Sequence, residues 1–173
     1  MKKLTMIAVF AMLLSMASSA FAIIDWAGNV WPNAGTDIAP AGDVAVYAQV
    51  YKAGVTDVPG PGMDIMADML LMNDLGDMLP VPMIFLQDVG ANDEYTALIP
   101  QSFIAGSTWV EAEINFHDLT DMTVYHDTMD QAGNMNPFRY NVLNVLPNDV
   151  DVTFTLCMSG TETMGDPCII GSA

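Results

Sequence analysis

Three short segments rich in Asp, Asn and Gly are the places where this chain could hold a hard metal ion. They cover residues 73–77, 88–94 and 127–134. Ca²⁺ takes six to eight oxygen ligands, often from flexible loops that contain glycine. None of the segments has EF-hand spacing, and solvated acidic turns are the competing interpretation of each. Calcium is nevertheless the one cofactor that the sequence suggests, and the best candidate ligands are Asp88, Asn92, Asp93 and Glu94.

The two histidines, His117 and His126, are candidates for a transition-metal site. If residues 118–121 form a hairpin turn, His126 lies opposite Glu113 and His117 lies opposite Met122. One histidine facing one carboxylate is not a zinc site, which needs three or four protein ligands. This spacing therefore favours a cross-strand pair on the surface.

The methionines resemble a copper-binding set, since the chain has 15 of them. Four of these lie in the first 22 residues, and Met63, Met66, Met69 and Met72 recur at a step of three. On a strand this step alternates between the two faces, so it gathers no single cluster of thioethers. Core and interface packing is the favoured interpretation.

Catalytic signatures are missing from the sequence. It contains no H-E-x-x-H, no G-x-S-x-G and no phosphate-binding glycine loop. Only 4 Lys and Arg oppose 21 Asp and Glu, which gives a formal net charge of −17. Such a charge repels nucleic acid and leaves little to bind anionic substrates. We expect neither an enzyme nor a nucleic-acid-binding protein.

The first 22 residues have the pattern of a cleaved signal peptide. Lys2 and Lys3 precede an apolar stretch over residues 4–16, and Ala20-Phe21-Ala22 fits the small-x-small cleavage rule. The apolar stretch is shorter than the roughly 20 residues that span a bilayer. Cleavage after Ala22 would remove two lysines and take the net charge from −17 to −19. We expect residues 23–173 to be secreted or at the cell surface, and not embedded in a membrane.

The mature chain reads as short strands separated by turns. Residues 43–52 alternate with period two, with Val44, Val46, Ala48 and Val50 on one face and Tyr47 and Tyr51 on the other. Residues 64–72 alternate less cleanly and also fit a helix. The further predicted strands are 83–87, 94–99, 108–117, 122–126, 138–146 and 151–158. This spacing predicts an all-β chain with one domain over 23–173, an immunoglobulin-like two-sheet β-sandwich of about seven to nine strands.

One stretch resembles an immunoglobulin-like module of bacterial secreted and cell-surface proteins. The resemblance rests on Val46-Tyr-Ala-Gln-Val-Tyr-Lys-Ala-Gly-Val-Thr-Asp57, then Pro59-Gly-Pro-Gly62 with Ile65 and Ala67. Asn92-Asp-Glu-Tyr95 is similar to the module's next landmark, and Thr123-Val-Tyr-His-Asp127 is a weaker echo of a later one. The resemblance implies a β-sandwich at the cell surface. It implies no catalytic residues.

The segment behind the cleavage site is too apolar to remain in water. It carries Ile23, Ile24, Trp26, Val30 and Trp31. A terminal strand of this kind completes its own sheet or adds to the sheet of a neighbouring copy. With Tyr47 and Tyr51 facing outward, we expect a structural subunit that assembles into an extracellular homopolymer (a filament, sheath or surface layer) by strand addition and apolar contacts. The alternative is a monomeric module that adheres to surfaces or binds a ligand, for example carbohydrate through Trp26, Trp31 and Trp109.

We predict that Cys157 and Cys168 form a disulfide. They are the only cysteines, 11 residues apart, and Gly160 and Pro167 between them favour a closed loop. Mass analysis without reductant should find the pair oxidised. Two free thiols in the exported protein would contradict the prediction.

Overall fold

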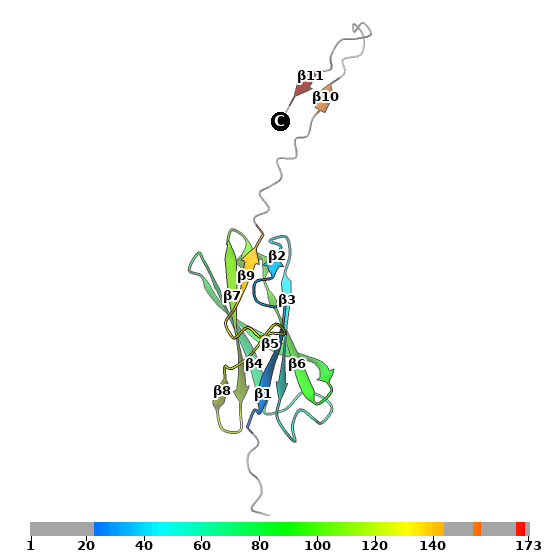
Figure 1. Cartoon of the computed structure of the whole chain (residues 1–173), viewed down its shortest axis with the longest axis vertical. Coiled ribbons are helices and arrows are strands. Elements are labelled where there is room, and N and C mark those ends of the chain that lie inside the picture. The colour runs from blue at the N-terminus through cyan, green and yellow to red at the C-terminus, as the bar shows by residue number, and fades with distance from the viewer. Residues whose placement is uncertain (1–22, 144–153, 157–168, 172–173) are drawn as a thin grey trace, which may run out of the picture. The chain divides into compact units, whose positions relative to one another are not determined.

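The computed structural model describes residues 23–143, 154–156 and 169–171 (Figure 1). They belong to two units, one up to Leu143 and the other from Asn144 onward, and each is described by itself. The predicted signal peptide and both cysteines lie outside the described residues. In the second unit two short strands pair antiparallel, with Leu156 opposite Ile169.

In its described residues, 23–143, the first unit is all-β apart from one four-residue helix, α2. Among the described residues, no helix has the length and hydrophobicity to cross a membrane. Its elements, in chain order, are β1 (Trp26–Trp31), β2 (Asp37–Ile38), β3 (Val44–Tyr51), β4 (Ile65–Asn73), β5 (Met78–Val89), β6 (Asn92–Ile99), α2 (Gln101–Ile104), β7 (Trp109–Asp118), β8 (Thr123–Tyr125) and β9 (Phe138–Val142). The second unit contributes β10 (Phe154–Leu156) and β11 (Ile169–Gly171).

The strands of the first unit form one mixed sheet, curled into a half-barrel, in the order β1-β3-β6-β5-β4-β7-β9-β2 with β8 beside β7. All pairs are antiparallel except β2 with β9. The long β5 joins the two halves, because its residues 78–83 pair with β4 and its residues 84–89 pair with β6. The all-β prediction is therefore confirmed, but the strands form one continuous sheet where two separate sheets were predicted.

The first half of β5 was missed by the sequence prediction, which began this strand at Met83. The reason is Pro80 and Pro82, which lie opposite Leu70 and Asp68 of β4. Proline has no N–H for a sheet ladder and normally indicates an interruption. Among the described strands only β4 pairs with residues 78–83, so within the described part of the chain the other edge of this half is open. In a strand, residues two apart direct their backbone nitrogens to the same edge. Pro80 and Pro82 therefore share an edge, and the open edge tolerates both because no described partner strand there needs an N–H.

The core forms where the inward faces of both halves meet. Val46, Ala48 and Val50 of β3 are fully buried, as the alternation of residues 43–52 predicts. Residues 64–72 also form a strand and not a helix, with their inward positions buried. Tyr95 of β6 packs edge-on against Phe116 of β7, with ring centroids 5.7 Å apart. This contact carries the core across the half-barrel.

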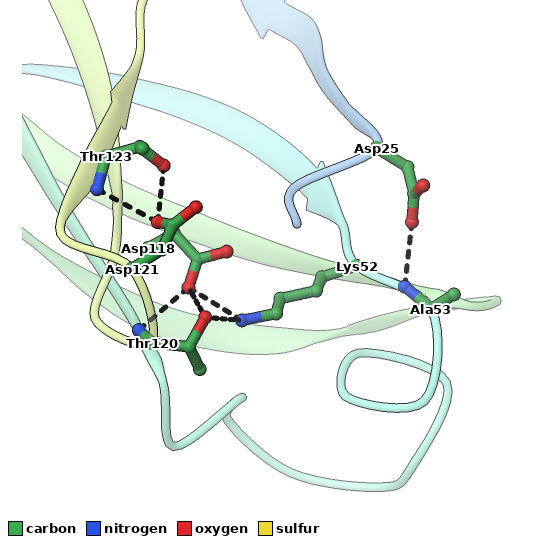
Figure 2. A network of polar contacts seen from close by, with 7 residues as sticks. All are labelled: Asp25, Lys52, Ala53, Asp118, Thr120, Asp121 and Thr123. Atoms are coloured by element: carbon green, nitrogen blue, oxygen red, sulfur yellow. Dashed lines mark hydrogen bonds and ion pairs between the residues drawn. The ribbon is translucent and has the colours of Figure 1, made fainter. Parts of the chain in front are cut away.

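A buried ion pair joins the end of β3 to the end of β7 (Figure 2). The Lys52 Nζ lies 2.7 Å from Oδ1 of Asp118, and the two side chains are 1% and 0% exposed. The same carboxylate oxygen accepts hydrogen bonds from the backbone N–H and the hydroxyl of Thr120. Burial by itself would raise the pKa of Asp118, but the hydrogen bonds from Lys52 and Thr120 outweigh it and hold that pKa below its ordinary value.

We predict that Lys52→Met lowers the free energy of unfolding by about 3–5 kcal/mol, because it leaves the Asp118 carboxylate buried without its cation. Urea denaturation measures the loss. The matched control is Arg139→Gln, since Arg139 pairs with Glu111 at 2.7 Å but is 53% exposed. The control should lose no more than about 1–2 kcal/mol. An equal loss in both variants would contradict a special role for the buried pair.

The pH dependence gives a second check on this pair. Because folding lowers the pKa of Asp118, the stabilisation is present above the ordinary value of 3.8 and is lost as the pH falls through the folded-state value. Stability of the native chain should therefore fall in this acidic range. The fall should be smaller in Lys52→Met, in which the carboxylate no longer gains the lysine on folding.

Candidate functional site

The outward face of β1, β3 and β6 carries aromatic side chains in register. Trp31 of β1 lies opposite Tyr47 of β3, and Tyr47 lies opposite Thr96 of β6. The Trp31 and Tyr47 rings are 5.9 Å apart between centroids and inclined at 45°. Trp31 is 49% exposed, so a large part of this pair faces solvent. The pair is an open aromatic surface on a rigid sheet.

A second aromatic pair lies on the same face, farther along the strands. Trp26 is opposite Tyr51, and the chain between Trp26 and Trp31 contains a bulge with Asn29 at φ 55. A Cβ on Gly28 would come within 2.8 Å of the Trp26 indole, so the ring lies directly over this glycine. The absence of a side chain at residue 28 therefore sets the position of the second aromatic ring.

Between the two aromatic pairs, amide and carboxylate side chains form a hydrogen-bonded row across four strands. Gln49 donates to Glu94 at 3.1 Å, and Gln87 donates to the other Glu94 oxygen at 2.7 Å. Asn29 and Asn92 both donate to the Gln49 oxygen, at 3.1 and 3.3 Å. We call this set the amide row. Its side chains are fixed by one another before any ligand arrives, and Gln49 at its centre is only 7% exposed.

The N-terminal segment predicted as an assembly strand is placed in the sheet of its own chain. Ile24 and Val30 are buried, whereas Ile23 is 59% exposed. β1 pairs with β3, and beyond the bulge Val30 donates to the Met129 carbonyl and accepts from the Gln131 N–H, at 3.2 and 3.4 Å. Addition of this strand to another copy would require these contacts to open, and it stays a prediction.

The four predicted calcium ligands are not brought together. Asp93 points into the protein and is fully buried, while Asn92 and Glu94 point to the outward face, because neighbouring residues of β6 alternate. Within the described ranges, no group of three or more His, Cys, Asp or Glu side chains is placed to hold a metal ion. Applying the same period of two to residues 92–94 would have revealed this split from the sequence. Calcium binding here stays a prediction, without a converging ligand set.

Asp88 and Asp93 instead hold the turn at residues 59–62. The Gly60 N–H donates to both Asp88 oxygens at 3.1 Å, and the Gly62 N–H donates to Asp93 at 2.7 Å. The second Asp93 oxygen, Oδ1, is buried without a hydrogen-bonding partner. Burial, and then the nearby charge of Asp88, raise the pKa of Asp93 despite the bond from Gly62. The Pro-Gly-Pro-Gly sequence is thus anchored by two carboxylates opposite each other on β5 and β6.

The predicted pairing of the histidines was wrong by two residues. His117 lies opposite Val124, and Met122 belongs to the turn, which extends over residues 119–122. The turn has the expected four residues, but it lies one residue later in the chain than the sequence prediction placed it. His126 Nδ1 still lies 3.7 Å from a Glu113 oxygen, although the observed register differs from the one that would place these two residues opposite each other.

Comparison with known proteins gives no relative: no family model, no curated protein and no solved structure matches this chain.

We predict that Asp93→Asn stabilises the protein at pH 7 by on the order of 1 kcal/mol. The raised pKa means that the ionised carboxylate opposes folding at neutral pH, and asparagine keeps the acceptor for Gly62 without the charge. The gain should disappear at acidic pH, where Asp93 itself becomes protonated. Thermal melting across this pH range measures both effects.

Asp88→Asn is the matched control, because Asp88 is exposed and should change stability little. Thermal melting in calcium and in chelator separates two roles of Asp93, a carboxylate that only anchors the turn and a carboxylate that holds a cation. If Asp93→Asn destabilises the protein, and calcium raises the melting temperature of the native chain alone, Asp93 holds a cation and the prediction is wrong.

Proposed function

We propose that this chain is an exported, non-catalytic binding module of the immunoglobulin-like kind that its sequence resembles, and that its outward face binds carbohydrate. The observation that supports this most is the arrangement of β3, where Tyr47 and Tyr51 flank Gln49 on one face. β1 adds Trp31 beside the first tyrosine and Trp26 beside the second. Two aromatic surfaces therefore lie on either side of the amide row.

This combination of side chains fits the chemistry of a sugar. One face of a pyranose ring is lined with C–H groups, which pack against aromatic rings, and its hydroxyls exchange hydrogen bonds with amides and carboxylates. An open sheet face suits an extended polysaccharide better than a small enclosed ligand. Because the amide row is already ordered, binding loses less side-chain entropy than it would with free side chains.

The charge of the protein restricts the polysaccharide. With 21 acidic residues and a net charge of −17, the chain repels anionic polymers. Glu94 is the carboxylate of the amide row, and both of its oxygens accept hydrogen bonds from glutamines. Glycoside hydrolysis commonly needs two carboxyl groups on either side of the scissile bond. We therefore propose a neutral polysaccharide that is bound and not cleaved.

Self-assembly is the second candidate, and another part of the same outward face favours it, since Ile84 lies opposite Thr96, which lies opposite Tyr47. Ile84 and Leu86 of β5 and Leu98 of β6 are 66%, 46% and 48% exposed. Aliphatic side chains gathered on neighbouring strands of an acidic protein are typical of a contact with another protein. In this alternative the exported chain is a structural subunit, and apolar contacts build a homopolymer.

We predict that Trp31→Ala weakens binding of the recognised polysaccharide about tenfold or more, because it removes the more exposed ring of the first aromatic pair. Affinity electrophoresis against a panel of neutral polysaccharides finds the ligand, and calorimetry measures its Kd. Trp109→Ala is the matched control: this tryptophan lies on β7, with the Arg139 guanidinium 4.1 Å from its ring centroid. The control should bind normally, and equal weakening in both variants would contradict the proposed face.

Sedimentation separates the second candidate from the first. If no polysaccharide binds, and the native chain forms large particles that Ile84→Asp dissociates, self-assembly replaces carbohydrate binding. A monomer that binds polysaccharide supports the first proposal.

A further inference from the structure

A cavity of about 210 Å³ opens on the other half of the sheet, away from the aromatic face. It is lined by residues of β4, β5 and β7, by the turn that follows β7 and by the first residue of β8. Three of its lining side chains offer nitrogen or sulfur to a ligand: Met66, His117 and Met122. The same cavity is also lined by Ala67, Asp68, Pro82, Asp118, Leu119 and Thr123.

Strand register brings two of these three donors together. Met66 of β4 lies directly opposite His117 of β7. Opposite residues of an antiparallel pair have Cβ atoms about 4.5–5.5 Å apart, so a thioether and an imidazole at these positions reach a common point. Met66 is 58% exposed, and its side chain therefore contributes little to the core.

The third donor, Met122, is held at the cavity by an ordered turn. Its φ of 62° is uncommon for a residue other than glycine, and such conformations persist where the surrounding structure fixes them. Asp118 accepts from Thr120, and Asp121 accepts from the N–H and hydroxyl of Thr123, on either side of Met122 (Figure 2). Met122 is nevertheless 79% exposed. An apolar side chain is thus fixed in the open at the mouth of the cavity.

His117 is oriented for ligation. Its Nε2 contacts the Asp68 carboxylate, whose other oxygen lies 3.4 Å from the Asn115 amide nitrogen. Among the described residues, nothing hydrogen-bonds to Nδ1 of His117. A carboxylate on one ring nitrogen fixes the tautomer and increases the basicity of the other nitrogen, as for many metal-binding histidines. Of the carboxylates at the cavity, Asp68 contacts the histidine and Oδ1 of Asp118 accepts from Lys52, whereas Oδ2 of Asp118 is buried without a hydrogen-bonding partner.

We propose that Met66, His117 and Met122 bind one soft monovalent metal ion, Cu(I) or Ag(I), through two thioether sulfurs and Nδ1. Thioethers select soft ions, and imidazole also suits copper, whereas Ca²⁺ and Mg²⁺ prefer oxygen. Asp68 is a positioning residue in this arrangement. The site is independent of the carbohydrate proposal, since it uses other strands and other residues.

The experiment titrates the protein with Ag(I), which has the coordination chemistry of Cu(I) without its redox reactions. A Cys157→Ser/Cys168→Ser background removes the thiols as competing soft ligands. Methionine labelled with ¹³C at its methyl group reports the ligands individually by NMR. We expect one equivalent of Ag(I) to shift the Met66 and Met122 methyl signals together with the His117 ring signals. Zn(II) and Ca(II) should leave all of them unchanged.

Substitutions test the three ligands against matched methionines. Met66→Leu, Met122→Leu and His117→Asn should each weaken Ag(I) binding at least tenfold, while Met63→Leu and Met78→Leu, which replace exposed methionines outside the cavity, should not. Asp68→Asn should weaken it about tenfold with an unchanged melting temperature, and Asp68→Glu should recover part of the loss. Equal Ag(I) affinity in ligand and control variants, preference for Zn(II), or shifts spread over all exposed methionines would overturn the proposal.

Discussion

The Lys52 ammonium and the Asp118 carboxylate are both removed from water, and either charge alone would be costly to bury. They lie at the ends of β3 and β7, which belong to opposite halves of the curled sheet and do not pair with each other. A direct contact between these strands therefore depends on side chains. The ion pair supplies this contact between the strands. The contact is directional as well as attractive, because the ammonium and the Thr120 hydroxyl both donate to a single carboxylate oxygen.

Both proposed sites depend on the strands that this ion pair joins. Tyr51, in the aromatic face, immediately precedes Lys52 in the chain. His117, in the cavity, immediately precedes Asp118, and the turn that carries Met122 begins with the Asp118–Thr120 hydrogen bonds. Movement of either strand end would displace a ligand-binding side chain as well as the buried charges. The rigid core and the two surfaces are thus parts of one structural unit.

The acidic residues have mainly structural roles where the structure describes them in detail. Each of the three segments that suggested calcium contains a carboxylate that accepts hydrogen bonds from backbone N–H groups. Asp74 accepts from Thr108 at 3.0 Å, Asp93 accepts from Gly62, and Asp130 accepts from Ala132 and Asn134. Hydrogen bonds from Asn134 and from backbone groups outweigh the effect of burial and lower the pKa of Asp130. Such loops share the composition of calcium loops because both use carboxylates to order a turn.

Local alternation in the sequence was enough to determine the all-β class and the strand at residues 43–52. It also determined the outward positions of Tyr47 and Tyr51, because the side chains of a strand alternate between its faces whichever strand it pairs with. Pairing partners were decided only by the tertiary structure. Three features bring together residues that are distant in the chain: the pairing of the two halves of β5 with different strands, the amide row, and the pairing of Met66 with His117. A turn of the expected four residues, placed one residue later in the chain, moved the β7–β8 register by two and brought Met122 to the cavity. Register is set by the packing of whole strands and by where each turn begins, and neither is encoded in the residues of one strand.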